Sequence, residues 1–443
     1  MGGRLWVFCL RLWWLGAFAA LLLVRLALSV TAGGRGDLPI EISLALGLLA
    51  FSMVIAAAVL PSRVRSISRV LGVEAILGWH RWLGLAAILL TLAHVVFVLV
   101  HRPADIRLLD LRSDPPRAKA ATLATLCLLA LYGLMLLRAR LRRRYEIFRF
   151  LHAVLGIAVL VLAGLHVYWL NHLIRDLAMR ICFVSIAVLT LLVLARRWVV
   201  SPLLAYRRPF KVVEVRREAP DAVTLALKPV GPHARPFTFR AGQYAWLRLG
   251  SPFAVLKERP FSMSSGSHEG DQVEFTVREV GRMTRRLAAV RPGQRVYLDG
   301  PHGALTMPRR RSEGVVFVAG GIGITPIMSM LRTLADAGDP RHHRLVVGVR
   351  RVEDVLFTEQ ISDLRARLRM TVVLVLSQPH PQWRGPHGRI DADLLADVLG
   401  RRRRDRVDAY VCGPPPMVTS VVAHLVALGV PASRVHSEQF DLG

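Results

Sequence analysis

Four histidines within apolar stretches are the residues of this sequence best suited to chemistry. His80 and His94 are 14 residues apart, and His152 and His166 repeat that spacing. In an α-helix, 14 residues return to within ~40° of the same face and climb ~21 Å. Two such helices side by side would pair their imidazoles at two depths. Imidazoles on opposite sides of an iron are the usual axial ligands of a low-spin haem, so the pattern predicts two haems held by these four side chains.

The alternative interpretation is that these histidines only pack between helices or lie at helix ends. One histidine in an apolar helix would leave that alternative open. Two stretches with the same spacing at matched depth favour haem ligation, because ionisable side chains within a bilayer are costly and usually functional.

Membrane-spanning helices are the elements that must position these histidines. The chain has 443 residues, 53% of them hydrophobic, and the apolar residues concentrate in the first 200. We therefore predict a six-helix transmembrane domain over 1–200, with the paired histidines on the third and fifth helices. The stretches long enough to cross a ~30 Å hydrocarbon core are about 5–29, 38–60, 74–100, 120–138, 147–170 and 174–195.

The first of these stretches also has features of a secretory signal peptide. Its length and its charged residues Arg11 and Arg25 favour a retained helix.

The distribution of positive charge predicts the orientation. With the N-terminus inside, the predicted cytoplasmic stretches hold more arginine and lysine than the outer loops. The sequence thus predicts a multi-pass protein of the cell membrane with both chain ends in the cytoplasm.

The formal net charge of +28 raises the question of nucleic-acid binding. Much of that charge lies in juxtamembrane loops, where it sets topology and meets anionic lipid, and no nucleic-acid motif accompanies it. The four cysteines, Cys9, Cys127, Cys182 and Cys412, are far apart, whereas an iron–sulfur site needs several thiolates at short spacing. We expect no nucleic-acid partner and no iron–sulfur cluster in this chain.

After Tyr206 the hydrophobic pattern changes to that of a soluble protein. Short alternating segments at 211–216, 222–227 and 272–278, bounded by glycine and proline, predict a small antiparallel β-barrel over 206–308.

From Gly314 onward, apolar strands alternate with helical stretches. The predicted strands are 315–318, 345–349, 372–376 and 409–411. This alternation is typical of a parallel sheet with crossover helices, so we expect an α/β domain over 312–443. A barrel followed by such a unit indicates a flavin and a pyridine nucleotide.

The segment Arg259-Pro-Phe-Ser-Met-Ser-Ser265 resembles the flavin signature of the ferredoxin-reductase superfamily. The resemblance implies that Arg259 contacts the flavin pyrophosphate, that Phe261 lies along the isoalloxazine, and that Ser262 reaches the ring. A planar guanidinium suits a diphosphate, and an aromatic face suits a tricyclic ring. The same resemblance extends FAD binding to Gln243, Tyr244, Ser265, Gly281 and Thr284. Gly281 and Thr284 also fit an ordinary helix start.

The segment Val318-Ala-Gly-Gly-Ile-Gly-Ile-Thr-Pro326 joins a predicted strand to a predicted helix. Its glycines Gly320, Gly321 and Gly323 let the backbone approach a nucleotide pyrophosphate, and the helix N-terminus favours the negative charge. Thr325 suits the helix cap and Pro326 the first turn. The segment resembles the nucleotide loop of the same superfamily.

Three further matches follow in the order that this superfamily has: Gly300-Pro-His-Gly303, Cys412-Gly-Pro-Pro-Pro-Met417 and Phe440. They imply that Cys412, Gly413 and Pro414 lie beside the nicotinamide, and that Phe440 covers the flavin face that the nicotinamide must reach. Cys412 and Phe440 are thus the expected catalytic residues. His302 stands where an aromatic is common, and 441–443 extend beyond Phe440.

Taken whole, the chain resembles the NADPH oxidase and ferric reductase family. That resemblance implies electron flow from cytosolic NAD(P)H to FAD, to the haem of His80 and His152, to the haem of His94 and His166, and to an acceptor on the outer face. Oxygen would give superoxide, and ferric iron would give ferrous iron. Two alternatives stay open: a haem-free membrane anchor whose reductase feeds a soluble partner, and a haem-binding redox sensor.

The choice of nicotinamide nucleotide depends on the residues after strand 345–349. Arg350 and Arg351 stand where a nucleotide ribose is expected and suit a 2′-phosphate, which favours NADPH. Glu353 and Asp354 would instead suit a free 2′-hydroxyl, which leaves NADH open.

Four residues nearer the predicted haems are further candidates. Arg25 and Arg81 are candidates for contacts with the haem propionates, and His101 and His172 for an outer pocket.

Overall fold

The computed structural model describes residues 38–63, 65–112, 115–140, 145–170, 177–267, 270–307, 312–400 and 404–440. The chain divides into two compact units, Met1–Val200 and Ser201–Gly443. The first predicted span, at 5–29, lies outside the described residues, as do Arg25, His172 and 441–443.

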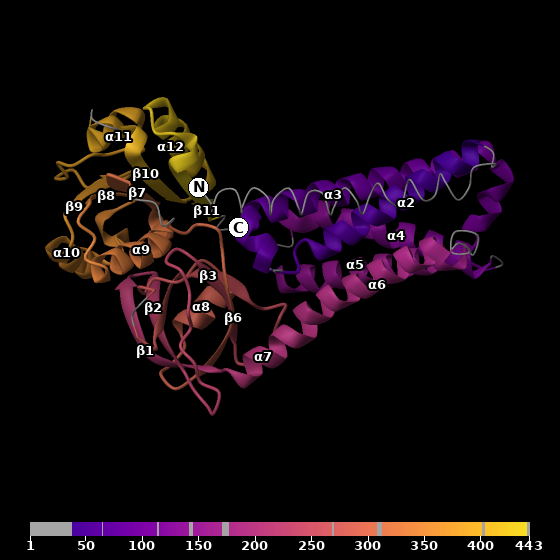
Figure 1. Ribbon diagram of the computed structural model, residues 1–443, viewed down its shortest axis with the longest axis horizontal. Helices are drawn as coiled ribbons and strands as arrows, with labels where there is room; N and C mark the ends of the chain where they lie inside the picture. Colours follow the sequence, from indigo (N-terminus) through magenta and orange to yellow (C-terminus); the bar gives the residue numbers. More distant parts are fainter. Residues whose placement is uncertain are drawn as a thin grey trace. The chain divides into compact units, whose positions relative to one another are not determined.

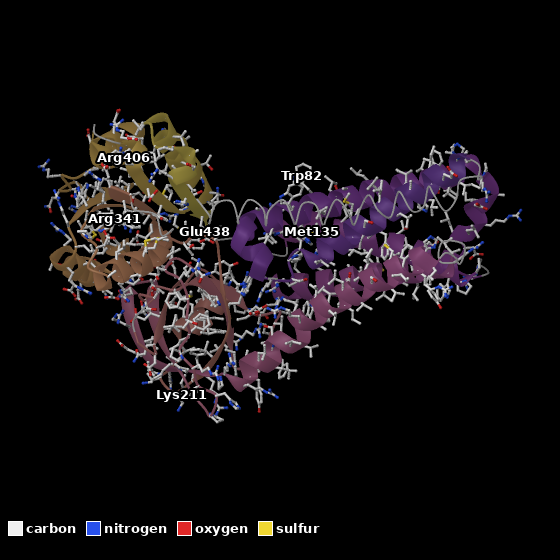
Figure 2. All side chains as sticks on the ribbon, in the orientation of Figure 1. Trp82, Met135, Lys211, Arg341, Arg406 and Glu438 are labelled. Atoms are coloured by element: carbon white, nitrogen blue, oxygen red, sulfur yellow. The ribbon has the colours of Figure 1, made fainter. Side chains whose placement is uncertain are left out.

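The described residues contain five helices long and apolar enough to cross a membrane (Figure 1). They are α2 (Leu38–Val59), α3 (Arg65–His101), α4 (Pro116–Leu136), α5 (Tyr145–Trp169) and α6 (Leu177–Ala195). A π-helical turn at Arg196–Val200 carries α6 into α7 (Ser201–Arg207), and a short helix, Pro103–Leu109, follows α3. Large apolar side chains face outward, such as Trp82 on α3, which is 69% exposed (Figure 2). Such exposure suits a lipid-facing surface.

These five helices overlap the five spans predicted after residue 37, although the last apolar helix continues through α7 to Arg207 rather than ending at residue 195. The start of α3 differs, because the helix begins at Arg65 rather than at residue 74. Its first turns carry Arg65, Ser66, Ser68 and Arg69, so a hydropathy pattern detects only the apolar part that follows. That apolar part, Ala75–His101, agrees with the prediction.

After α7, the second unit continues with six antiparallel strands. They are β1 (Phe210–Ala219), β2 (Ala222–Pro229), β3 (Tyr244–Leu249), β4 (Arg259–Ser262), β5 (Val273–Arg278) and β6 (Arg295–His302), in the order β4-β3-β6-β1-β2-β5. The alternating segments recognised in the sequence lie in β1, β2 and β5, so the antiparallel sheet is confirmed. A bridge between Met263 and Phe275 links the end of β4 to β5, the strands at opposite ends of this order. A fully closed barrel stays a prediction.

A five-stranded parallel sheet follows. Its strands are β7 (Gly314–Gly320), β8 (His342–Val349), β9 (Met370–Leu376), β10 (Val407–Gly413) and β11 (Val435–Gln439), in the order β11-β10-β7-β8-β9. One face packs on α9 (Ile324–Asp336) and α10 (Thr358–Arg367), and the other on α11 (Ala392–Leu399) and α12 (Pro415–Ala427) (Figure 1). The parallel α/β prediction is confirmed.

The strand order of this sheet identifies the edge where a ligand would bind. From β7 the chain moves outward to β8 and β9, and it then returns to β10 on the other side of β7. In open parallel sheets, ligands bind beyond the carboxyl ends of the strands at such a reversal. The loops after β7 and β10 are therefore the candidate ligand loops.

Candidate functional site

His80 on α3 and His152 on α5 lie together, as the sequence predicts. Their ring centroids are 5.9 Å apart, with an angle of 64° between the ring planes. Transition metals bind imidazole nitrogen at about 2 Å, so two axial imidazoles on one iron have centroids roughly 6 Å apart. The observed separation fits a single iron between the two rings.

Backbone carbonyls orient three of the four histidines. His80 Nδ1 lies 2.9 Å from the carbonyl of Ala57, His94 Nδ1 lies 2.7 Å from that of Ser43, and His166 Nδ1 lies 2.9 Å from that of Arg117. A carbonyl can only accept, so each Nδ1 carries the proton and each Nε2 presents a lone pair. Metal-bound histidines are typically held in this way.

Within the described ranges, the fourth histidine lacks such a carbonyl, and one glycine lies against His94. His152 Nδ1 is buried and has no hydrogen-bond partner among the described residues. Gly47 lies against His94, because a Cβ built there would be 3.2 Å from the imidazole. No group of three or more His, Cys, Asp or Glu side chains gathers in the described part of the chain. His101, outside the pairs, is exposed and stacks on Phe97 at 4.1 Å.

The flavin-type segment forms β4 and its continuation in the second unit. Tyr244 on β3 pairs with Ser262, and Ala245 pairs with Phe261. Ser262 is 4% exposed, and its hydroxyl has no hydrogen-bond partner among the described residues. An unsatisfied buried polar group costs about 1–3 kcal/mol, so this hydroxyl suits a bound molecule with a hydrogen-bonding atom.

Other predicted flavin residues form hydrogen bonds within the protein. Gln243 Oε1 accepts from the Arg240 N–H at 2.9 Å, and Ser265 Oγ accepts from the Glu274 N–H at 3.0 Å. Thr284 Oγ1 accepts from the Gly281 N–H at 2.9 Å and caps α8 (Arg282–Ala288). Gly281 and Thr284 do open a helix, and their contact with a flavin stays a prediction.

The glycine loop after β7 packs tightly on the turn after β10. A Cβ at Gly323 would collide with the carbonyl of Cys412, and one at Gly320 would lie 2.8 Å from Pro414 Cδ. Gly321 has a φ of +53°, which favours glycine. The two candidate ligand loops are therefore in contact, and only glycines allow this packing.

The predicted cap of α9 is wrong. Gly323 is the N-cap, and Thr325 lies in the first turn, where its hydroxyl donates to the Ile322 carbonyl at 3.0 Å. The reason is that a 3₁₀ turn at Gly321–Gly323 leads directly into the helix and moves its start forward. Pro326 lies in the first turn, as predicted.

Cys412 and Phe440 also lie at this edge of the sheet. The Phe440 N–H donates to the Gly413 carbonyl at 2.9 Å, which fixes the near-terminal aromatic beside the turn after β10. The Cys412 side chain is fully buried, in the core that contains Phe317. The catalytic roles of Cys412 and Phe440 stay predictions.

Arg278 is a candidate binding residue that the sequence did not identify. Arg350 and Arg351 are exposed after β8, and Asp354 Oδ2 accepts from the Arg351 N–H at 3.2 Å. Arg278, the last residue of β5, reaches these loops: its Nη2 donates to the Asp354 carbonyl at 3.3 Å, and its Nη1 lies 3.4 Å from a Cβ built on Gly321. In the sequence, Arg278 is recognisable only as a cation at the end of a predicted strand, and this does not indicate which residues lie near it in space.

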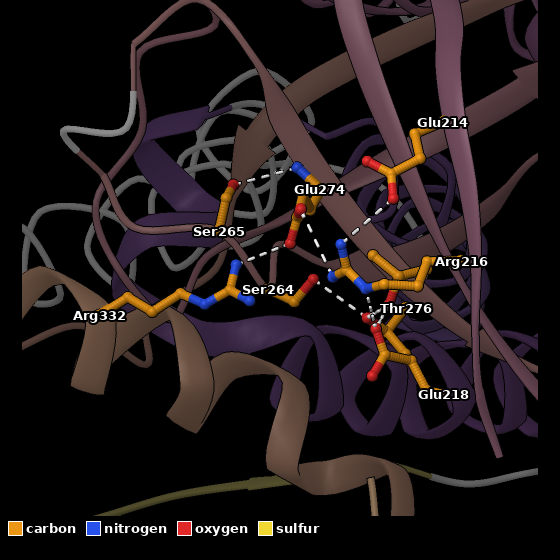
Figure 3. A network of polar contacts seen from close by, with 9 residues as sticks. Glu214, Arg216, Glu218, Ser264, Ser265, Glu274, Thr276 and Arg332 are labelled. Carbon is orange, nitrogen blue, oxygen red and sulfur yellow. Dashed lines mark hydrogen bonds and ion pairs between the residues drawn. The ribbon is translucent and has the colours of Figure 1, made fainter. Parts of the chain in front are cut away.

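A polar network joins the antiparallel sheet to α9 (Figure 3). Arg332 on α9 donates to Glu274 on β5 at 2.6 Å, and the other oxygen of Glu274 lies 3.6 Å from Arg216. Burial would lower the Arg216 pKa, but the charges of Glu274 and Glu218, with Glu214, outweigh it, so the pKa is raised. The network lies next to the flavin-type segment, because Ser265 binds the backbone of Glu274.

Two protein families match separate parts of the chain. The model of the ferric reductase-like transmembrane component matches residues 46–163, and that of the oxidoreductase NAD-binding domain matches residues 317–423. The first range contains His80, His94 and His152, and the second contains the glycine loop and the turn after β10.

Two individual relatives are a reductase and a reductase component by name. Ferredoxin–NADP reductase B of Sorangium cellulosum is 30% identical over 245 residues, which cover 51% of this chain and 100% of the relative. The reductase component of propane 2-monooxygenase from Rhodococcus jostii is 30% identical over 238 residues, which cover 52% of this chain but only 62% of the relative. The FAD- and NAD-binding domain of nitric oxide dioxygenase from Vibrio cholerae is a similar solved structure, with 24% identity and a TM-score of 0.47, covering 53% of this chain and 98% of that one.

Proposed function

This chain belongs to the ferredoxin reductase family and joins that module to a ferric reductase-like transmembrane component, and we propose that it carries electrons from NAD(P)H across a membrane. The electrons would pass through FAD and two b-type haems to an acceptor on the outer face. The protein is thus proposed to be a flavohaem oxidoreductase.

The observation that carries the proposal is the geometry of the histidines. The ring separation of His80 and His152 fits one iron, and the carbonyls that bind His80, His94 and His166 leave each Nε2 available. His80 with His152 would hold one haem, and His94 with His166 the other. An iron held by two histidines would have no open position for the acceptor, which would then receive electrons without binding to the metal.

Residues of the second unit would bind the flavin and the nucleotide. Arg259 would neutralise the flavin pyrophosphate, and the buried hydroxyl of Ser262 would hydrogen-bond to the flavin ring. The N-terminus of α9, with Gly320, Gly321 and Gly323, would receive the nucleotide pyrophosphate. A flavin supplies the conversion from a two-electron hydride donor to one-electron transfers.

The proposed acceptor is oxygen or ferric iron. The same electron path would serve either one, so the path does not distinguish them. A second candidate function is a haem-free anchored reductase that donates to a soluble partner. It is favoured by relatives that are named reductase components of monooxygenases.

An absorption spectrum of the purified full-length protein separates these functions. After haem-replete expression, we expect a low-spin b-type spectrum that changes on anaerobic addition of NADPH or NADH in the presence of FAD. Reduction of artificial dyes without any haem absorption would replace the haem pathway with the anchored reductase.

A further inference from the structure

Cationic side chains from two separate segments surround a surface cavity of about 230 Å³ in the second unit. Arg207 ends α7 and Arg208 follows it, whereas His233 and Arg235 lie between β2 and β3. Leu204, Pro232 and Ala234 complete the lining. The fold thus brings three guanidinium groups and an imidazole to one concave site.

The cavity has cations without a counter-charge. None of its lining residues is acidic, and among the described residues none of Arg207, Arg208 and Arg235 has a side-chain hydrogen bond or ion pair. Several arginines elsewhere in this unit are paired with carboxylates, such as Arg248 with Glu258 at 2.7 Å. Guanidinium groups bind phosphate through parallel N–H donors, so a phosphate group would balance the charge and satisfy the donors.

The position of the cavity in the chain indicates where this phosphate comes from. The last candidate membrane span, Arg180–Arg207, ends at a residue of the cavity. On the same short helix, Leu203, Leu204 and Tyr206 are 46%, 49% and 60% exposed. Exposed apolar side chains beside cations match the boundary between acyl chains and headgroups. We propose that this cavity binds the phosphate of an anionic phospholipid.

The main competing explanation is that these arginines only set membrane topology. That explanation applies to Arg207 and Arg208, because the topology signal acts within ~15–20 residues of a span. Arg235 follows Arg207 by 28 residues, so topology does not account for it. Arg235 is therefore the informative residue.

The test measures lipid binding by the full-length protein in a zwitterionic detergent, by isothermal titration calorimetry. The probes are dihexanoyl phosphatidylglycerol, dihexanoyl phosphatidylcholine and inorganic phosphate. We expect saturable binding of the phosphatidylglycerol and at least ~10-fold weaker binding of the other two probes. An Arg208→Gln, Arg235→Gln variant should lose ~10-fold or more in affinity, because two charge-assisted contacts disappear.

The matched control is an Arg285→Gln, Arg286→Gln variant, which loses the same charge from exposed positions on α8. Equal weakening in this control would overturn the proposal, because bulk charge would then explain the binding. Equal affinity for inorganic phosphate and for the lipid, lost in the cavity variant, would overturn the lipid source. If the double variant does not fold, Arg235→Gln alone decides, and unchanged lipid affinity in it would overturn the proposal.

Discussion

Arg332 Nη1 lies 2.6 Å from Glu274 Oε2. This ion pair joins α9, the helix after the glycine loop, to β5, the strand beside the flavin-type segment. The two side chains are only 11% and 15% exposed. One residue further along α9, Thr333 Oγ1 accepts from the Ser267 N–H at 2.9 Å. These contacts set where the nucleotide helix lies relative to the antiparallel sheet.

The Arg332–Glu274 pair should contribute measurably to stability. In a double-mutant cycle with Arg332→Met and Glu274→Gln, we expect a coupling of ~0.5–3 kcal/mol in the free energy of unfolding. The cycle is measured by denaturant unfolding of the full-length protein in detergent, followed by the fluorescence of the second unit.

The same helix offers a matched control. Asp336 on α9 pairs with Arg367 on α10 at 2.7 Å, but these side chains are 27% and 52% exposed. Exposed pairs typically contribute ~0–1 kcal/mol. Equal coupling in the two cycles would show that burial does not strengthen the Arg332 pair.

The histidine pairs should be separable by mutation. His80→Leu with His152→Leu should remove one haem, and His94→Leu with His166→Leu should remove the other, because each pair would supply both axial ligands of one iron. Haem content per chain, from the spectrum of the reduced pyridine complex, measures both outcomes. Loss of both haems in both variants would leave the assignment of ligands to pairs unsupported.

Gly47 should affect only the haem of His94. A Cβ at this position would be 3.2 Å from Nδ1 and Cε1 of His94, so in Gly47→Ala the imidazole must move. We expect a shifted midpoint potential for one haem in a spectroelectrochemical titration. Gly133→Ala is the control, because a Cβ there meets nothing within 4 Å.

Arg259 should be required for tight flavin binding. Arg259→Ala removes a charge-assisted contact worth ~1.5–3 kcal/mol, so the FAD dissociation constant should rise by ~10-fold or more. Fluorescence titration of FAD measures this constant, and Lys257→Ala controls for the loss of one nearby positive charge. An unchanged FAD dissociation constant in Arg259→Ala would contradict the assignment of Arg259 to the flavin pyrophosphate.

Arg278 should recognise the diphosphate of the nucleotide. Its Nη1 lies beside Gly321, where the pyrophosphate is proposed to bind. In Arg278→Met, the dissociation constant of NADP⁺ should rise by ~10-fold or more, whereas that of nicotinamide mononucleotide, which lacks the diphosphate, should stay the same. Calorimetry measures both constants. Parallel weakening of the two ligands would instead indicate a structural role for Arg278.

Arg350 and Arg351 should discriminate between NADPH and NADH. In a double Arg350→Ala, Arg351→Ala variant, kcat/KM for NADPH should fall by ~10-fold or more, because the partners of the 2′-phosphate are lost. The value for NADH should not change. If the wild type prefers NADPH and the double variant keeps that preference, other residues discriminate.

The sequence predicted the elements and motifs that local patterns determine. Hydropathy located the five described spans, but not the polar first turns of α3 at Arg65. The glycine loop was identified from residue types alone. The N-cap of its helix was not, because the start of α9 depends on how the 3₁₀ turn at Gly321–Gly323 packs.

The contacts that the sequence could not predict join distant segments. Arg278 approaches Gly321, and Arg332 meets Glu274, only because the antiparallel sheet packs on the nucleotide-type helix. In the same way, the histidine spacing predicts a shared helix face, but the carbonyls that orient His80 and His94 come from α2, another helix.

Main-chain carbonyls, rather than side chains, orient the imidazoles of His80, His94 and His166. The acceptors at Ala57, Ser43 and Arg117 are main-chain oxygens, so no side-chain substitution at these positions removes them. Acceptors of this kind raise the electron donation of a metal-bound imidazole and thereby tune the metal. Substitutions at these three positions would thus leave the main-chain acceptors in place, whereas a shift of α2 or α4 along its axis would move them.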